Sequence, residues 1–263
     1  MIRPVLALAL LFPLSAFARQ DATDPVAPRA DDRWTLGVGV SAKDTAYAGE
    51  GVRLRPAPLV NFQGKRFYWQ GVTLGLHLWQ TPNFSLDAVV SGRFDGFDSG
   101  DLGQAELAAN GVDIDRLHER DEAADAGLAA RWQWAAHQLH VRALADITDA
   151  SGGYELSADY GYRVQWGRTT LIPGVGVRWM SDDMANYYYG VAPEETFAGV
   201  GYQPDAALVP HVGVAFSHPL AGKWRLQGLL RYQFLPDELA DSPLLERDAS
   251  GAAQVVIGVA RGF

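Results

Sequence analysis

The sequence predicts a transmembrane antiparallel up-and-down β-barrel of ten strands, and three observations predict it. First, the stretch 253–263 alternates, with Val255, Ile257 and Val259 on one face, and it ends on Phe263. Second, a period of two residues recurs from Trp34 onward, with hardly any helical pattern in competition. Third, tight turns alternate along the chain with long polar connections, which is typical of barrels that cross the bacterial outer membrane.

The N-terminal residues are typical of a secretory signal followed by a short arm. A positively charged start precedes the apolar run Val5–Leu14, and Ala16-Phe17-Ala18 fits the cleavage site of signal peptides. The run is shorter than the roughly 20 residues that a membrane-spanning helix requires. We therefore expect a signal peptide at 1–18, a periplasmic N-terminal arm at 19–33 and an outer-membrane β-barrel at 34–263.

Composition excludes several classes of protein. Apolar residues make up 48% of the chain, yet the mean hydropathy is −0.08. No apolar run after the signal reaches the length of a membrane helix, which excludes a helical membrane protein. The chain contains no cysteine, so disulfides and thiolate metal sites are excluded. A net charge of −9 without basic clusters argues against nucleic acid as a partner.

Ten segments have the length and alternation of membrane strands. The segment 154–166, for example, exceeds the 5–6 residues usual in globular sheets and reaches the roughly 9–11 that a tilted membrane strand needs. The expected strands are Trp34–Ala42, Phe67–Trp79, Phe84–Asp95, Asp125–Trp134, Gln138–Ile147, Tyr154–Trp166, Thr169–Met180, Ala206–Ser217, Lys223–Phe234 and Ala253–Phe263.

One further segment, Val52–Gln63, also has strand character. Counted as a spanning strand, it breaks the even number that returns both termini to the periplasm. We therefore assign it, with Arg66–Gln70, to an extracellular hairpin. Twelve strands is the alternative if this region is divided differently.

The tryptophans group by strand end, as in the aromatic belts of membrane barrels. Trp69 and Trp179 are expected near the extracellular ends of their strands. The periplasmic belt is expected to contain Trp34, Trp79, Trp132, Trp134, Trp166 and Trp224.

Charged residues recur on the faces that alternation turns inward. The expected lumen network consists of Asp87, Arg93, Arg131, Arg142, Asp146, Glu155, Asp159, Arg163, Arg178, Arg225 and Arg231. A ten-stranded lumen is narrow, because about eight strands only just accommodate side chains and about sixteen leave an aqueous channel. Opposed carboxylates and guanidiniums therefore favour a structural plug of ion pairs, and a narrow ion or solute path is the alternative.

The same faces offer little for catalysis. His140 and Asp146 share a face, but at roughly 3.3 Å per residue they lie about 20 Å apart. Neither a His-x-x-x-His nor a Gly-x-Ser-x-Gly motif occurs. Gly37 and Gly39 lie inside a strand, not before a helix as a dinucleotide site requires, and we expect them to admit neighbouring side chains into the lumen. No catalytic residue, cofactor or metal is expected.

The connection 181–205 is the candidate extracellular binding loop. Its acidic residues surround three consecutive tyrosines, which suits a cation, a cationic peptide or a host surface. The favoured alternative is a folded cap, in which the tyrosines pack on the barrel mouth and the acids face water. The candidate residues are Asp182, Asp183, Tyr187, Tyr188, Tyr189, Glu194 and Glu195. In the connection 96–124, Leu102–Ala109 predicts a short helix, and hence a lid.

Several motifs, in their order along the chain, carry a resemblance to a known family. Tyr47-Ala48-Gly49 follows the first strand, and Arg55-Pro56-Ala57-Pro58-Leu59 precedes the aromatic segment Phe62–Trp69. Tyr188-Tyr189-Gly190-Val191 and Asp241-Ser242-Pro243-Leu244 stand in two of the long loops. Together they resemble the MipA/OmpV family of outer-membrane proteins, over nearly the whole mature length.

One departure from the family pattern is visible. The family often has an aromatic residue two positions before the terminal phenylalanine, where this chain has Arg261. Arg261 can extend its head group to water at the membrane interface, so we expect weaker insertion signalling and the same fold.

The resemblance implies an integral outer-membrane protein with no agreed enzymatic activity. Members of the family have been regarded as scaffolds that link murein hydrolases to murein synthases, as adhesins and as channel-like proteins. The implied partners are outer-membrane lipid, a murein lytic transglycosylase and a penicillin-binding protein, docked on the arm or on the barrel rim. A small-solute channel and a surface adhesin or receptor acting through the long extracellular loops are the alternatives.

Overall fold

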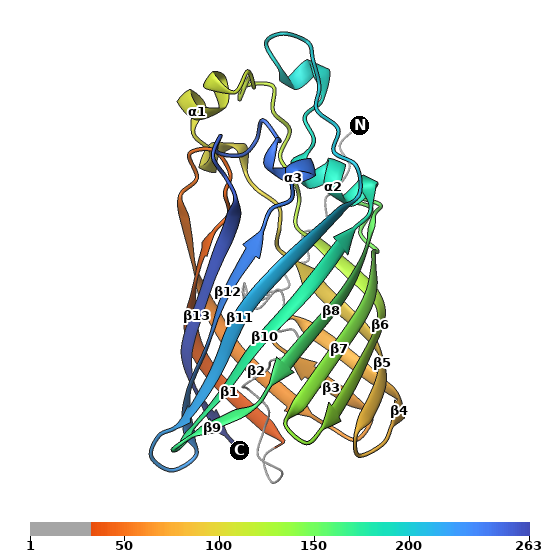
Figure 1. Ribbon diagram of the computed structural model, residues 1–263, viewed down its shortest axis with the longest axis vertical. Helices are drawn as coiled ribbons and strands as arrows, with labels where there is room; N and C mark the ends of the chain where they lie inside the picture. Colours follow the sequence, from red (N-terminus) through yellow and green to blue (C-terminus); the bar gives the residue numbers. More distant parts are fainter. Residues whose placement is uncertain (1–32) are drawn as a thin grey trace, which may run out of the picture.

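The barrel wall is one antiparallel sheet that closes where β1 pairs with β13 (Figure 1). The computed structural model describes residues 33–263, so the expected signal peptide at 1–18 and all of the arm except Arg33 lie outside the described residues. The strands are β1 (Trp34–Asp44), β2 (Val52–Gln63), β3 (Phe67–Gln70), β4 (Thr73–Gln80), β5 (Phe84–Arg93), β6 (Ala123–Trp134), β7 (His137–Asp146), β8 (Tyr154–Tyr162), β9 (Val164–Trp166), β10 (Thr169–Met180), β11 (Ala207–Pro219), β12 (Trp224–Phe234) and β13 (Gly251–Gly262).

These segments form twelve strands of the wall. β8 and β9 are two parts of one strand, because both pair with β10, on either side of Arg163. Every other strand pairs with its neighbours in the sequence. Short turns therefore gather at one end of the barrel, called the turn end below, and the long connections gather at the other, the loop end.

Period-two alternation places apolar side chains on the outside of the wall. In β13, Val255 and Ile257 are 44% and 43% exposed, whereas Val256 and Ala260 are buried in the interior. The expected outward face of the last strand is therefore confirmed. β10 begins and ends at the residues expected from the sequence.

The segment Val52–Gln63 is a strand of the wall, so the expected ten strands are wrong. It forms β2 and pairs with β1 along its whole length, from Asp44 opposite Val52 to Trp34 opposite Phe62. Two arginines and two prolines interrupt its apolar pattern, which is why it resembles a loop in the sequence.

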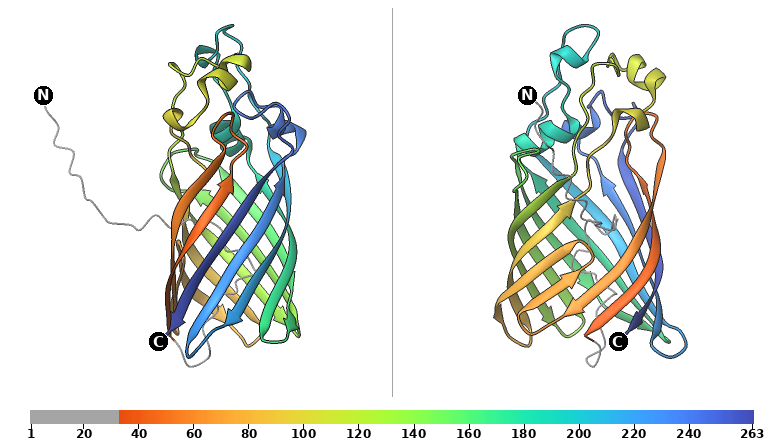
Figure 2. Two further views of the ribbon diagram at one scale, coloured as in Figure 1. Left: turned by 90° about the vertical axis from the view of Figure 1, so that its left-hand side faces the viewer. Right: turned by 180° about the vertical axis from the view of Figure 1, so that it is seen from behind.

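The expected single strand Phe67–Trp79 is instead a short hairpin. Gln70 pairs with Thr73, so Gly71 and Val72 form a two-residue turn. Gly71 has a φ of +55°, and glycine at the first central position is the requirement of a type II′ hairpin turn. The hairpin ends well short of the loop end, as the right-hand view of Figure 2 shows.

The hairpin also changes the assignment of Trp69. This residue lies beside Phe62, which itself lies opposite Trp34 at the start of β1. The expectation that Trp69 belongs to the extracellular belt is therefore wrong. Trp179 does lie near the loop end of β10, where its ring contacts that of Tyr154 at 5.4 Å.

Part of the lumen is filled by apolar side chains. One cluster contains Leu59, Ile172, Leu229 and Val256, from four different strands. Leu59 reaches across β1, because its Cδ1 atom lies 2.8 Å from where a Cβ on Gly258 would be. At Gly39 a Cβ would lie 2.5 Å from the carbonyl oxygen of Ile257. Gly258 thus admits the side chain of Leu59, whereas the expected inward glycine Gly39 admits the backbone of β13.

A folded cap covers the loop end. It contains three helices, α1 (Gln104–Ala109), α2 (Asp182–Tyr189) and α3 (Asp237–Ala240). No helix of the described chain is long and apolar enough to cross a membrane. The expected short helix in the connection 96–124 is confirmed as α1, which ends at Ala109 and is followed by its C-cap Asn110 and by Gly111 at φ +86°. A buried cluster joins the long loops, with Tyr47, Leu107, Val191 and Leu244 among its members.

Candidate functional site

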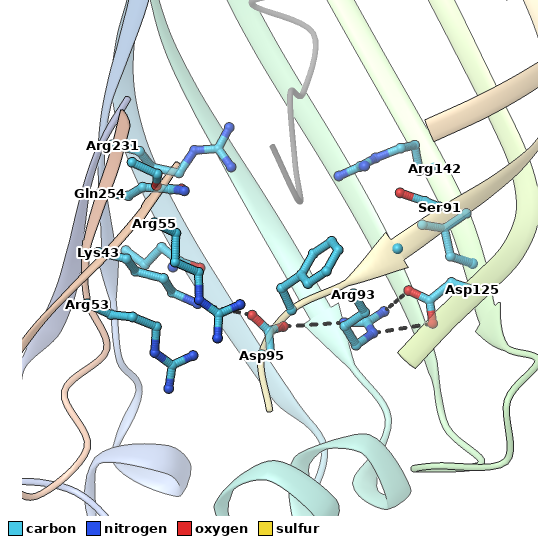
Figure 3. Close-up of a pocket in the computed structure, with 15 residues that line it drawn as sticks. Lys43, Arg53, Arg55, Ser91, Arg93, Asp95, Asp125, Arg142, Arg231 and Gln254 are labelled. Carbon is cyan, nitrogen blue, oxygen red and sulfur yellow. Dashed lines mark hydrogen bonds and ion pairs between the residues drawn. The ribbon is translucent and has the colours of Figure 1, made fainter. Parts of the chain in front are cut away.

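A polar chamber lies inside the barrel near the loop end (Figure 3). Its walls come from the last residues of β1 and β5, from the first residues of β2, β6 and β13, and from β7 and β12. The cavity is small, about 60 Å³. Its charged lining residues are Lys43, Arg53, Arg55, Arg93, Asp95, Asp125, Arg142 and Arg231.

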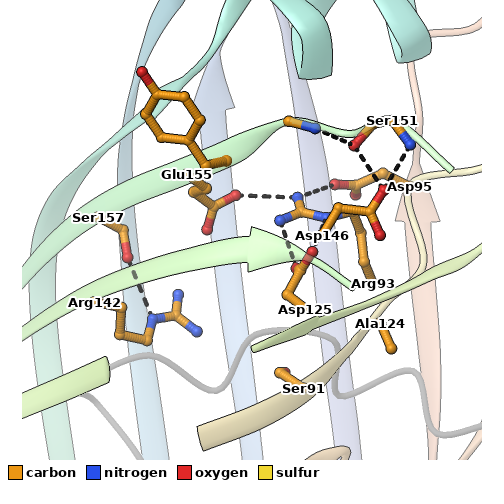
Figure 4. A network of polar contacts seen from close by, with 12 residues as sticks. Ser91, Arg93, Asp95, Ala124, Asp125, Arg142, Asp146, Ser151, Glu155 and Ser157 are labelled. Atoms are coloured by element: carbon orange, nitrogen blue, oxygen red, sulfur yellow. Dashed lines mark hydrogen bonds and ion pairs between the residues drawn. The ribbon is translucent and has the colours of Figure 1, made fainter. Parts of the chain in front are cut away.

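Arg93 is the centre of the ion pairs in this chamber (Figure 4). Its guanidinium lies 2.5 Å from Asp125, 3.1 Å from Glu155 and 3.5 Å from Asp95. The side chain of Arg93 is 1% exposed. A cation so deeply buried is tolerated only with carboxylates around it, because the cost of removing it from water is several kcal/mol.

Asp95 extends the network to two other strands. It accepts from Arg178 at 3.3 Å and from Lys43 at 3.2 Å. β1, β5, β6, β8 and β10 are thereby joined across the lumen. Of the expected network, Arg93, Glu155 and Arg178 do come together here. Asp125 and Lys43 also belong to this cluster of ion pairs, although the sequence did not predict them as members.

Two arginines of β2 complete the chamber, and sequence reasoning missed both as site residues. Arg53 pairs with Glu50 and donates to the carbonyl oxygen of Gly96 at 3.1 Å. Arg55 pairs with Glu122 at 2.7 Å. Their spacing of two residues indicates that both face the lumen, but only once Val52–Gln63 is recognised as a strand of the wall.

The structure forms two histidine–aspartate pairs that the sequence did not predict. His77 Nδ1 lies 2.6 Å from Asp87, which also accepts from the hydroxyl of Ser85. His211 Nε2 lies 2.6 Å from Asp159. These two residues come from β11 and β8 and meet over Gly176 of β10, where a Cβ would lie 2.4 Å from His211 and 2.6 Å from Asp159.

Other members of the expected network stand apart from Arg93. Arg131 donates to Gln70 and its guanidinium lies over the ring of Tyr68. Arg142 donates to Ser157 at 3.2 Å. Arg163 is exposed at the break between β8 and β9, while Arg225 is half-buried and Arg231 buried in β12.

Asp146 differs from its expected position in the lumen network. Its carboxylate accepts hydrogen bonds from the backbone amides of Thr148, Ser151 and Gly152. It also accepts from the side-chain hydroxyls of Thr148 and Ser151. It therefore holds the β7–β8 loop. Figure 4 shows this contact with Ser151 beside the Arg93 network.

The tyrosines of the candidate binding loop pack in the cap. Tyr188 is 1% exposed, while Tyr187 and Tyr189 are half-buried. The carbonyl oxygen of Tyr189 accepts from Ser242, and that of Tyr187 accepts from Arg120. Asp182, Asp183 and Glu194 are exposed. This arrangement corresponds to the folded-cap alternative. Within residues 33–263, no group of three or more His, Cys, Asp or Glu could hold a metal ion.

Glu195 differs from the other acids of that loop because it is buried. Its carboxylate accepts from Arg120 at 3.2 Å, from the Ala192 amide at 2.8 Å and from the His118 amide at 2.9 Å. Burial acts to raise the pKa of Glu195, but these hydrogen bonds outweigh it and the pKa lies below its usual value. The residue therefore ties the loop 181–206 to the connection 96–124.

We expect Glu195→Gln to destabilise the cap by about 2 kcal/mol, because a charge-assisted network loses its anion. Since folding lowers the pKa of Glu195, the stabilisation is complete above the ordinary carboxyl value of 4.5 and is lost as pH falls through the lower folded-state value. Hydrogen exchange of amides 190–200, followed as pH is lowered from neutral, measures both effects. The exposed neighbour Glu194→Gln is the control, and equal exchange in the two variants would contradict the assignment.

Comparison with known proteins identifies the family. A family model described as MltA-interacting protein MipA matches residues 36–263. The MltA-interacting protein of Escherichia coli (strain K12) is 29% identical over 234 residues, which cover 88% of this chain and 91% of that protein. Outer membrane protein OmpV of Vibrio cholerae is 26% identical over 102 residues, or 38% of this chain and 40% of that protein.

Solved structures contain similar barrels at low sequence identity. The NanC porin has a TM-score of 0.48 and 10% identity, over 87% of this chain and 100% of that one. The match of the family model from the first strand to the last residue decides the assignment. The chain is an outer-membrane β-barrel and belongs to the MipA family.

Proposed function

We propose that this protein is a non-enzymatic scaffold that holds a murein lytic transglycosylase, and with it a penicillin-binding murein synthase, at the outer membrane. The observation that carries the proposal is the similarity to the MltA-interacting protein over nearly the whole length of both chains. The name of this relative refers to binding of another protein. The surfaces to consider are therefore those that a periplasmic enzyme can reach.

The interior chemistry supports a role without catalysis. Two His–Asp pairs lie among the residues of the barrel. Ser85 donates to Asp87 and not to His77, so this pair presents no activated hydroxyl. Around Arg93 the carboxylates serve as partners of a buried cation, which is a structural use.

The turn end of the barrel has the charge of a docking face. Short turns of outer-membrane barrels face the periplasm. Among the described residues of the five short turns there is no acidic side chain, although the whole chain has a net charge of −9. Lys65, Arg66, Arg168 and Lys223 are exposed there. Such a face steers and orients a partner that presents an acidic surface.

The experiment is a binding measurement with the folded, detergent-solubilised barrel as bait and a purified MltA-type lytic transglycosylase as prey. We expect binding that weakens with salt, because exposed charges are screened within about 10 Å at 0.1 M. Lys65→Glu/Arg168→Glu is expected to weaken it at least about tenfold, through a lower association rate.

Arg116→Glu is the matched control, since Arg116 is an exposed cation of the cap. Heat-shifted gel mobility verifies that each variant is folded. Absence of binding by the folded wild-type barrel would reject the scaffold proposal. Equal loss in the control would reject the turn end as the docking face.

A further inference from the structure

The barrel wall is incomplete above the β3–β4 hairpin. β2 pairs with β3 only at Asn61–Gln63, and beyond it the Gly71 amide donates to the Val60 carbonyl. β5 pairs with β4 as far as Ser91. Among residues 33–263, no strand pairs with the second edge of β2 from Val52 to Leu59. The right-hand view of Figure 2 shows β2 continuing toward the cap after the hairpin has ended.

The unpaired edge of β2 carries prolines at two of its four positions, 52, 54, 56 and 58, whose backbone points into the opening. The Val60 carbonyl points to this edge, and residues two apart in a strand share an edge, so Pro56 and Pro58 point there too. Proline has no N–H to leave unpaired. An orphaned donor facing hydrocarbon costs several kcal/mol, and an unpaired edge with its donors intact would recruit a foreign strand. The two prolines therefore remove half of the donors that this edge would otherwise leave unpaired, which favours an edge that stays open.

Phe94 lies where the opening meets the polar chamber. It lines the chamber, and a Cβ on Gly92 would lie 2.9 Å from its ring and 3.7 Å from Val72 at the tip of the hairpin. The aromatic ring therefore stands above the hairpin, between β5 and the space beside β2. Arg53 and Arg55 line the chamber from β2 itself, next to the unpaired edge.

The chamber is rich in cations although the chain is acidic. Six of its lining residues are basic and two are acidic, as the charged set named above shows. The carboxylates of Glu50, Glu122 and Glu155 also pair with arginines of this lining, so six cations stand against five carboxylates. Such surroundings favour an anion, above all a phosphate or carboxylate that arginine can bind with two hydrogen bonds.

The outer surface beside the opening is apolar. Leu54 of β2 is 69% exposed, Leu74 of β4 is 53% exposed and Val90 of β5 is 44% exposed. The cap lies over the chamber at the loop end, with Tyr47 and Phe97 in its buried cluster. A ligand that uses the side opening therefore meets hydrocarbon outside and guanidinium groups inside.

We propose that the opening between β2 and β5 is a lateral port for an anionic amphiphile of the membrane. Its phosphate or carboxylate head binds in the chamber beside Arg53 and Arg55, and its alkyl tail leaves past Phe94 into the lipid. This binding site is separate from the turn end proposed for protein docking. Failure of either proposal leaves the other intact.

Photolabelling in bilayers tests the port. The barrel is placed in phosphatidylcholine nanodiscs with an alkyl phosphate that carries a diazirine in its chain, and labelled peptides are mapped by mass spectrometry. We expect saturable labelling concentrated in 52–60 and 88–97. Dodecyl phosphate should compete, whereas dodecyl maltoside at equal concentration should not. Labelling spread evenly around the wall would show only lipid adsorption and overturn the proposal.

Two variants and one competitor separate the remaining outcomes. Arg55→Gln is expected to weaken labelling about tenfold, the effect of one charge-assisted hydrogen bond, and the turn-end control Arg168→Gln is expected to leave it unchanged. Phe94→Ala is expected to increase the labelling rate. Inorganic phosphate that competes as well as dodecyl phosphate would show a site for free anions and reject a lateral port. Equal labelling of Arg55→Gln and the control would reject the chamber as the head-group site.

Discussion

Arg93→Ala is expected to lower the free energy of unfolding by about 3–5 kcal/mol, the usual effect of breaking a buried ion cluster at one member. The guanidinium is 1% exposed and faces Asp125, Glu155 and Asp95. Its removal takes from the three carboxylates the one cation that they all share, although Arg178 still lies 3.3 Å from Asp95 and 3.6 Å from Glu155. Repulsion between them then adds to the cost of keeping each one away from water.

Urea unfolding of the barrel in lipid vesicles measures this effect, with tryptophan fluorescence and heat-shifted gel mobility as two readouts. Arg168→Ala is the matched control, because it removes the same side chain from an exposed turn. A loss below about 1 kcal/mol, as for surface ion pairs, would mean that water reaches the cluster freely. A variant that does not fold is followed by Arg93→Lys, which keeps the charge and is expected to lose only part of the stability.

Labelling of single cysteines in β2 is expected to give an almost all-or-none contrast. The chain has no cysteine of its own, so each introduced thiol reports alone. Pro56 is exposed on the outer face of β2, in a strand that pairs with β1 along its whole length. Pro56→Cys in vesicles should therefore resist a membrane-impermeant maleimide, whereas Glu194→Cys in the cap should react.

The ten-strand arrangement gives the opposite expectation at Pro56. There the segment Val52–Gln63 belongs to a loop in water, and both thiols would react at similar rates. Similar rates, with folding verified by gel mobility, would contradict the twelve-stranded wall.

Alternation predicted most of the wall because the lipid and the lumen impose it on nearly every strand. It located both ends of β10, and it identified the outward face of β13. It failed at β2 and at the β3–β4 hairpin for physical reasons. β2 has arginines at 53 and 55 because these positions face the polar chamber. It tolerates prolines at 56 and 58 because these positions lie at an unpaired edge. Gly71–Val72 turns the chain in two residues without the Asn or Asp typical of such turns.

The site was less predictable, because its partners come from strands far apart in the sequence. Arg93 and Glu155 could be placed on inward faces but not paired, since their contact depends on the curvature of the wall. His211 meets Asp159 only because Gly176 leaves space between them. Asp146 was assigned to the lumen by its position in β7, but the amides of the next loop offered nearer partners. The folded cap could be predicted, because three consecutive tyrosines in a loop have large rings that are stabilised by packing against other side chains.

We infer that the barrel has no continuous path along its axis. The cap joins the connections that follow β1, β5, β10 and β12 over the mouth, and apolar side chains such as Leu59, Ile172 and Leu229 meet in the lumen. Recording from the purified, folded wild-type barrel in planar lipid bilayers tests this most directly. We predict no discrete single-channel steps under an applied voltage. Reproducible unitary steps that scale with salt concentration would show an open axial path and contradict the account.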